Sequence, residues 1–217
     1  MKNIEHQKAI YSNYTGKYHG EKIGKLFNFI VGKYIKDKML DIGAGDGSLI
    51  KSLKNIGYKD VIGIDLEPKN ETVLKGDISN LNFNDNSFQT ITLTEVFEHL
   101  TIEQIETGLH EIKRVLMKNG HLIITVPFKE DPNQNTVCCP NCKINFHRYG
   151  HEQFFNNEKE IVDILNKNNF DIVWMKPFSM GPMAAYPILK YFNFIYKKFS
   201  HLDAFSQTLF VVCKSTK

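Results

Sequence analysis

The stretch MLDIGAGDGS (39–48) joins an apolar run to a turn that has glycines at alternate positions. Glycine lets a backbone approach a ligand closely, so such a turn after a strand is typical of a nucleotide site. Its Gly-x-Gly-x-Gly spacing differs from the dinucleotide fingerprint, and no Gly-Lys-Ser/Thr follows as in a P-loop. Asp41 and Asp46 would repel a diphosphate. The stretch therefore favours a nucleotide that carries positive charge, and S-adenosylmethionine has an ammonium and a sulfonium.

A further acid, Asp65, ends the apolar run VIGID, about 20 residues beyond the glycine turn, where an acid in a doubly wound sheet accepts ribose hydroxyls. A nicotinamide dinucleotide needs the same acid. Asp65 thus supports nucleotide binding without choosing the nucleotide. The alternative is that Asp65 only caps a turn.

The segment VCCPNCKINFHRYGH carries a second chemistry. Cys139, Cys142, His147 and His151 offer two thiolates and two imidazoles, which is a tetrahedral zinc set, and Cys138 is an alternative ligand. The spacing predicts one structural zinc that orders this segment. Two alternatives stay open: a redox thiol, and a metal-free loop whose histidines contact a substrate or lie at the surface.

Helical and strand-like patterns alternate along the chain. This alternation predicts an α/β fold with a doubly wound, mostly parallel sheet in a single domain, 1–217. In the helix that begins at Thr101, Gly120 occupies the place of a C-terminal glycine. The expected helices cover 21–35, 47–58, 101–120 and 156–170, and the expected strands cover 38–42, 60–68, 87–96, 121–127, 170–177 and 207–215.

The composition indicates which kinds of partner and which cell compartment to expect. The chain has 217 residues, a formal net charge of +3 and almost no arginine, which is too mild a charge to indicate a nucleic-acid partner. The N-terminal residues have no apolar signal-peptide core, and no stretch reaches the roughly 18 apolar residues of a membrane span. We therefore expect a cytoplasmic protein. Its oligomeric state is left open.

Four motifs follow one another in order: MLDIGAGDGSL, VIGIDLEP, KGDISNLNFNDNSFQTITLTEVFEHL and EIKRVLMKNGHLIITVP. Together, over 38–127, they resemble the successive motifs of class I S-adenosylmethionine-dependent methyltransferases, in particular the branch that acts on small molecules. The resemblance implies a seven-stranded sheet whose last strand is antiparallel. One departure is Gln89, which stands where the family commonly has an acid that supports the turn.

The resemblance also assigns roles to individual positions. It gives the ammonium of the cofactor to Asp41 through water, the ribose hydroxyls to Asp65 and the adenine amino group to Asp77. The positions that it places in the cofactor pocket are Asp41, Gly43, Ala44, Gly45, Asp65, Leu66, Asp77, Ile78, Glu95 and Val96.

Methyl transfer needs an acceptor held in line behind the methyl group, and a protonated acceptor also needs a base. His99, just after the fourth strand, is the candidate base, and its alternative is a histidine that only packs. Glu98 is expected to be a solvated or capping acid. The function expected is methyl transfer to a small-molecule or modest polar acceptor. The alternative is a non-catalytic S-adenosylmethionine-binding sensor or partner protein.

Three segments are expected to cover the pocket. Residues 1–36 form an N-terminal helical cap, in which Tyr18 and His19 either close over the cofactor or form a surface turn. Residues 128–152 form the Cys/His-rich loop insert, and 178–203 form an aromatic segment over the acceptor site. A membrane-surface or dimer contact is the alternative for the aromatic segment.

Overall fold

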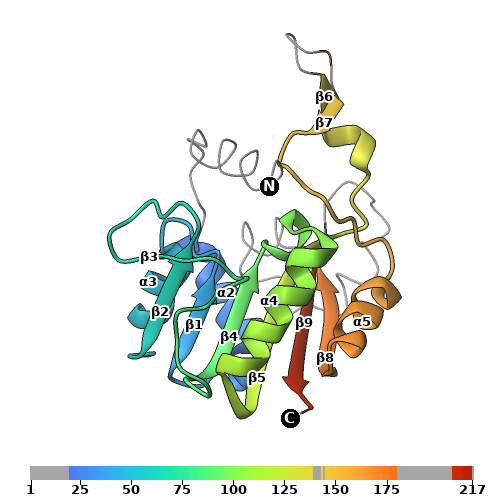
Figure 1. Ribbon diagram of the computed structural model, residues 1–217. Helices are drawn as coiled ribbons and strands as arrows, with labels where there is room; N and C mark the ends of the chain where they lie inside the picture. The colour runs from blue at the N-terminus through green and yellow to red at the C-terminus, as the bar shows by residue number, and fades with distance from the viewer. Residues whose placement is uncertain (1–19, 139–142, 144, 180–206, 217) are drawn as a thin grey trace, which may run out of the picture.

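The computed structural model describes residues 20–138, 143, 145–179 and 207–216. Its centre is a seven-stranded sheet in the order β3-β2-β1-β4-β5-β9-β8 (Figure 1). The neighbours from β3 to β5 pair in parallel, and β9 is antiparallel to both β5 and β8. The expected doubly wound sheet with an antiparallel last strand is confirmed. The strands are β1 (Met39–Ile42), β2 (Val61–Asp65), β3 (Leu74–Lys75), β4 (Phe88–Thr94), β5 (Leu116–Phe128), β8 (Phe170–Phe178) and β9 (Gln207–Ser215).

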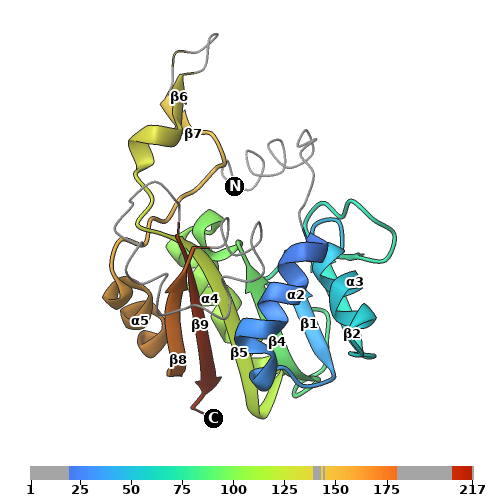
Figure 2. The same ribbon diagram turned by 180° about the vertical axis from the view of Figure 1, so that it is seen from behind.

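Helices cover both faces of this sheet. Figure 1 shows α4 (Ile102–Val115) and α5 (Glu158–Lys167) in front of it, and Figure 2, from behind, shows α2 (Gly20–Val31) and α3 (Ser48–Asn55) on the other face. Each layer has its own apolar core against the sheet. Within the described ranges, three short 3-10 helices lie in the connections: η1 (Gly32–Tyr34), η2 (Phe97–His99) and η3 (Pro132–Asn135).

The central strands read as nearly continuous apolar runs because both of their faces are covered. All four residues of β1 are buried, including its one acid, Asp41. Helix starts are marked in the sequence as well. Thr101 and Gln104 form a capping box at α4, and Asn157 and Glu160 form one at α5. These elements fix the carboxyl ends of β1, β2 and β4 at one edge of the sheet.

The helix expected over 101–120 ends earlier than its apolar spacing predicts. Helix α4 stops at Val115, and Leu116 already belongs to β5, where it pairs with Phe88. The left-handed residue is Asn119, with φ 62°, rather than Gly120, and it lies within β5 where the pairing with β4 shifts in register. Sheet pairing therefore overrides the helical pattern in the last five positions.

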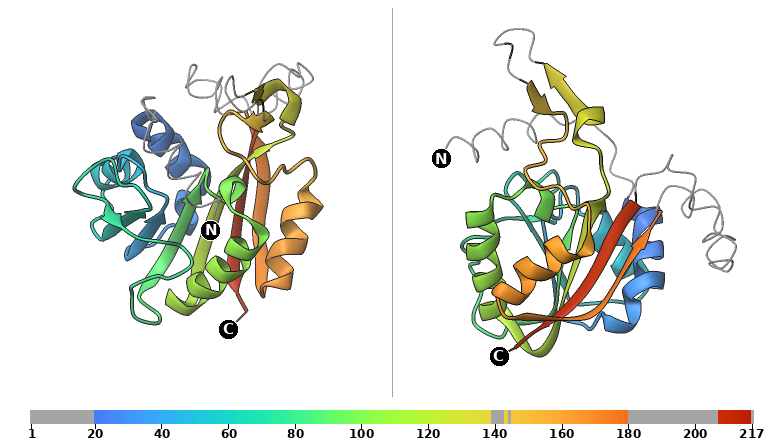
Figure 3. Two further views of the ribbon diagram at one scale, coloured as in Figure 1. Left: turned by 45° about the horizontal axis from the view of Figure 1, so that its top comes forward. Right: turned by 90° about the vertical axis from the view of Figure 1, so that its right-hand side faces the viewer.

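The Cys/His-rich insert, 128–152, is not simply a loop. It contains η3 and a two-stranded hairpin of β6 (Thr136–Cys138) and β7 (Asn145–His147). The hairpin stands above the sheet in Figure 1 and in the right-hand view of Figure 3. Cys139 and Cys142, which stand between these two strands in the sequence, lie outside the described residues.

The other two covering segments are described only in part. Helix α2 and η1 occupy the second half of the expected cap, 1–36, as far as Tyr34. Tyr18, His19 and nearly all of 178–203 lie outside the described residues. Within the described part of the chain, none of the helices combines the length and the apolar character that a membrane crossing requires.

Candidate active site

The glycine turn follows β1 at the carboxyl edge of the sheet, where ligands bind in doubly wound folds. Gly43, Gly45 and Gly47 all have positive φ, at 75°, 54° and 73°. Most of the N–H groups in this turn have protein acceptors. Gly43 and Ala44 donate to the carbonyl of Ile64, at 2.8 and 3.0 Å, and Gly45 donates to Asp65 Oδ2 at 2.8 Å. These N–H groups are therefore not offered to a phosphate, in agreement with the non-dinucleotide spacing.

Gly43 has a steric role that a substitution can measure. A Cβ at this position would collide with the side chain of Val96, and φ is positive as well. We expect Gly43→Ala to destabilise the protein by about 2–5 kcal/mol, from left-handed strain and overpacking together. Gly57→Ala is the matched control, because Gly57 also has positive φ but its added Cβ meets no atom within 4 Å. Equal melting temperatures for the two variants would contradict the steric role.

A cavity of about 280 Å³ opens at this edge of the sheet. It brings together every position that the sequence placed in the cofactor pocket except Asp77, and it also includes His99. The additional lining residues come from β1, α3 and β4 and from the connections that follow the strands. They are Ile42, Asp46, Ser48, Leu49, Glu67, Lys69, Gly76, Thr94 and Leu100.

Acidic side chains outnumber basic ones in the cavity lining. Five of the lining residues are acids, Asp41, Asp46, Asp65, Glu67 and Glu95, while lysine contributes only Lys69. Carboxylates held near one another in a concave site favour a positively charged ligand. A ligand with an ammonium and a sulfonium matches this balance better than a diphosphate does.

Asp41 is the most deeply buried of these acids, at 2% exposure. It lies opposite Thr92 in the parallel register of β1 and β4, and the Thr92 hydroxyl donates to Asp41 Oδ1 at 2.6 Å. Burial raises the pKa of Asp41 to about 7, with the Thr92 hydrogen bond opposing the rise and the charge of Asp65 adding to it. Asp41 is thus poised to lose a proton when a cation arrives.

Asp65 is the last residue of β2, and Asp77 follows the neighbouring strand β3. Asp65 accepts from the N–H groups of Gly45 and Glu67, one on each carboxylate oxygen, at 2.8 and 2.9 Å. This fixes its carboxylate at the cavity wall. Asp77 accepts from the Ser79 N–H at 2.8 Å. Its assignment to the adenine amino group stays a prediction, whereas Ile78 does line the cavity.

Glu95 follows β4 in a left-handed conformation, with φ 55°. A non-glycine residue with positive φ is uncommon and is often found where a site requires it. Its N–H donates to the Thr125 carbonyl at 3.1 Å, and the Thr125 hydroxyl donates to Glu95 Oε1 at 2.9 Å. These bonds direct Glu95 and the next residue, Val96, into the cavity wall.

The segment on which Asp77 and Ile78 lie is anchored by an arginine. Arg114 Nη2 and Nη1 donate to the carbonyls of Leu81 and Phe83, both at 2.7 Å, and Glu111 accepts from Arg114 and from the Leu81 N–H. This pair of α4 residues therefore supports the turn before β4. Gln89, which departs from the family pattern, is the second residue of β4.

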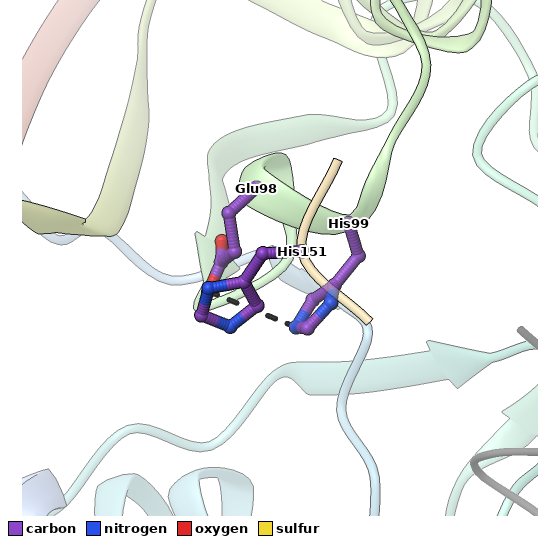
Figure 4. Close-up of side chains that lie close together, drawn as sticks. All are labelled: Glu98, His99 and His151. Atoms are coloured by element: carbon purple, nitrogen blue, oxygen red, sulfur yellow. Dashed lines mark ion pairs between the residues drawn. The ribbon is translucent and has the colours of Figure 1, made fainter. Parts of the chain in front are cut away.

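Glu98 differs from the sequence expectation. It is not a solvated or capping acid: its exposure is 1%, and burial together with the charge of Glu95 raises its pKa well above the ordinary range. The reason is that η2 turns back beneath the insert, where the N–H groups of Glu152 and Gln153 donate to the Glu98 carbonyl. Figure 4 shows its side chain beside those of His99 and His151.

His99 projects from η2 to the cavity wall. Its Nδ1 lies 3.3 Å from the Gly150 carbonyl, and its Nε2 lies 3.7 Å from Glu98 Oε1. Burial, reinforced by the neighbouring His151, lowers the pKa of His99 to about 4. His99 is therefore neutral at physiological pH, and because a carbonyl only accepts, Nδ1 carries the proton and Nε2 the lone pair.

The insert brings its two histidines to the same place. The ring centroids of His147 and His151 lie 4.3 Å apart, and the His99 and His151 centroids lie 4.9 Å apart. Glu130 joins them, with Oε2 at 2.7 Å from His151 Nδ1 and Oε1 at 3.4 Å from His147 Nε2. Glu130 is not among the ligands that the sequence predicts. The predicted zinc set with Cys139 and Cys142 stays a prediction, since both cysteines lie outside the described residues.

The sheet order and the antiparallel last strand define a doubly wound α/β fold, and its acid-rimmed cavity lies at the edge of the sheet where such folds bind ligands. Comparison with known proteins makes this definition more specific, because a family model described as a methyltransferase domain matches residues 40–124. Residues 40–124 run from β1 into β5, so the match includes the glycine turn and most of the residues that line the cavity.

The matches to curated relatives cover only part of this chain and part of each relative. The chain is 31% identical to the eEF1A lysine and N-terminal methyltransferase of Mus musculus, over 43% of this chain and 17% of that protein. It is also 31% identical to an uncharacterized methyltransferase of Oceanobacillus iheyensis, over 54% of this chain and 62% of that protein. The chain thus spans less than a fifth of the mouse protein's length.

Among solved structures, the 1,6-didemethyltoxoflavin-N1-methyltransferase of Burkholderia thailandensis, with bound S-adenosylhomocysteine, has a TM-score of 0.65 to this chain. The superposition covers 99% of this chain and 91% of that one, at 17% identity. At this identity the likeness concerns the fold.

Proposed function

We propose that the protein transfers a methyl group from S-adenosylmethionine to a small-molecule or modest polar acceptor. The observation that carries the proposal is the cavity at the carboxyl edge of the sheet. It combines five acids with a glycine turn whose N–H groups largely have protein acceptors. That environment suits a cationic nucleoside and disfavours a diphosphate.

Different residues of the cavity are assigned to different parts of the cofactor. Asp65, held by two backbone N–H groups, is assigned to the ribose hydroxyls. Leu66 and Ile78 offer apolar contact to the adenine, and Asp41 faces the ammonium. Glu95 and Val96, after β4, form the wall nearest the methyl group. These assignments follow the family resemblance, and the cavity supports all of them.

The reaction is an in-line displacement. The acceptor lone pair forms a bond to the methyl carbon while the carbon–sulfur bond breaks, and the electron pair of that bond stays on sulfur, which becomes a neutral thioether. The protein has to position the acceptor and exclude water. A hydroxyl or ammonium acceptor must also lose a proton.

His99 is our candidate for the group that receives this proton. It lies on the cavity wall and is neutral, with its lone pair on Nε2. Its lowered pKa makes it a weak base, so its contribution would come from placement at the acceptor. We expect His99→Gln to reduce kcat by about 10²- to 10⁴-fold, the usual contribution of a general base. An unchanged kcat would remove His99 from this role.

The function is tested by incubating the protein with methyl-labelled S-adenosylmethionine and separate pools of small metabolites and of protein amines. The proposal predicts label in the small-molecule pool, with His110→Ala, an exposed histidine on α4, as the matched control for His99→Gln. Cofactor binding without label in either pool would favour the sensor alternative. Label in protein would assign the acceptor to a macromolecule. The cytoplasmic location stays a prediction.

A further inference from the structure

Glu98, His99 and His151 form a compact cluster beside the cofactor cavity (Figure 4). One carboxylate oxygen and one nitrogen from each imidazole lie within 4.8 Å of one another. The side chains are largely enclosed, at 2% exposure for Glu98, 14% for His99 and 8% for His151. Two imidazoles and a carboxylate at such spacing can surround one metal ion.

The hydrogen bonds of the two histidines determine which nitrogen can bind an ion. His99 Nδ1 faces the Gly150 carbonyl at 3.3 Å, and His151 Nδ1 faces Glu130 Oε2 at 2.7 Å. Both partners accept, so both Nδ1 atoms carry the proton and both Nε2 atoms carry the lone pair. Metal-binding histidines usually have this arrangement, in which the second nitrogen donates to a carbonyl or a carboxylate.

The third member of the cluster, Glu98, has a carboxylate oxygen that lacks a hydrogen-bond partner among the described residues. This oxygen, Oε2, is buried. A buried carboxylate oxygen in this state is costly unless a proton or a cation compensates it. A carboxylate facing imidazole lone pairs consists only of acceptors, which a cation would hold together.

A second set of possible ligands, Glu130, His147 and His151, overlaps the first. The bonding of His147 argues against it. His147 Nδ1 accepts from the backbone N–H of His151 at 3.2 Å, so a neutral His147 carries its proton on Nε2. Nε2 is then not available to an ion in this arrangement. Glu130 fits better as the group that orients His151.

We propose that Glu98, His99 and His151 bind one divalent transition-metal ion, with both histidines ligating through Nε2 and Glu130 orienting His151. The ion would lie at the cavity wall on which His99 is placed. There it could hold an acceptor oxygen or nitrogen and lower its pKa. With the ion present, the acceptor would lose its proton to solvent, and His99 would act as a ligand in place of a base. This catalytic role rests on the proposed function, whereas binding of the ion does not.

The proposal is tested on the full chain after chelator treatment, by calorimetric titration with Zn²⁺ and with Mn²⁺ in the absence of cofactor. We expect one ion per chain. Glu98→Gln, His99→Ala and His151→Ala should each weaken binding by more than about 100-fold, and Glu130→Gln by about 10- to 100-fold, as is typical of a group that orients a ligand. His147→Ala and the surface control His110→Ala should bind as the unsubstituted protein does.

Substitution of Co²⁺ identifies the ligands without any variant. Histidine and carboxylate ligands predict d–d absorption without the intense thiolate charge-transfer band that Cys139 or Cys142 would produce. Thermal melting of each variant shows whether it is folded, and Glu98→Gln keeps the size of the buried side chain.

Three results would overturn the proposal: no stoichiometric ion in the unsubstituted protein, a thiolate band, or binding lost in His147→Ala and kept in Glu98→Gln. S-adenosylhomocysteine is titrated separately into the chelator-treated protein. If it does not bind, the proposed function fails, independently of the result for the ion.

Discussion

Replacing Asp65 by alanine is expected to weaken S-adenosylmethionine binding by at least about 100-fold, or about 3 kcal/mol, the lower limit for two hydrogen bonds to a charged acceptor. The carboxylate ends β2 at the cavity wall, and two backbone N–H groups hold it there. It is thereby oriented before the ribose arrives, and this preorganisation adds to affinity. Calorimetry with S-adenosylmethionine measures the change.

Two further variants separate the charge from the structural role. Asp65→Asn keeps an oxygen acceptor for the turn but loses the charge, so it should bind the cofactor less well than the unsubstituted protein and better than Asp65→Ala. Asp60→Ala removes an exposed acid at the other end of the same strand and should have no effect. Equal affinities for Asp65→Ala and Asp60→Ala would contradict the assignment of the ribose.

Asp41→Asn is expected to stabilise the protein while weakening cofactor binding. The folded-state pKa of Asp41 is about 7, above its ordinary value of 3.8. Between these pH values the folded state binds more protons than the unfolded state, so the free energy of unfolding falls as pH rises through this window. The full penalty, on the order of 4 kcal/mol at most, applies above pH 7. Asparagine avoids ionisation and still accepts from Thr92.

Thermal melting at pH 8 and at pH 4 checks this stability prediction. The variant should be more stable than the unsubstituted protein at pH 8 and nearly equal to it at pH 4. Equal stabilities at both pH values would show that Asp41 does not carry a buried charge.

The same carboxylate links cofactor binding to pH. The ammonium of S-adenosylmethionine attracts the ionised form of Asp41, so the affinity of the unsubstituted protein should rise from pH 6 to pH 8, and binding near pH 7 should release a proton. Asp41→Asn should lose this pH dependence and bind about tenfold less tightly at pH 8, the weakening expected from about 1.4 kcal/mol.

Much of the fold could be predicted because its signals are local. The apolar runs of β1, β2 and β4 are bounded by glycine or polar turns, and capping residues mark the starts of α4 and α5. The end of α4 could not be predicted in this way. The spacing of Leu116 suits a helix, and only its pairing with Phe88 places it in β5.

The position of the cavity was predictable for a related reason. Each of its motifs lies at the carboxyl end of a parallel strand, and those ends meet at one edge of the sheet. The Glu98–His99–His151 cluster has no comparable signal. Its members come from η2 and from the insert, about 50 positions apart in the chain, and the burial of Glu98 depends on that long-range contact.

The pairing of Glu130 with His151 follows from the return of the insert over the end of β5. The sequence contains both residues but not the distance between them, which is set by the hairpin of β6 and β7. Thiolate and imidazole types alone therefore suggested a zinc set, whereas the structure added the carboxylates.

Titration of S-adenosylmethionine, and separately of NAD, into the unsubstituted protein tests the central claim most directly. The cavity is lined by acids, and most N–H groups of its glycine turn donate to protein acceptors. We therefore expect one equivalent of S-adenosylmethionine to bind and NAD to give no heat under the same conditions. Saturable binding of NAD, or the absence of any binding of S-adenosylmethionine, would contradict it.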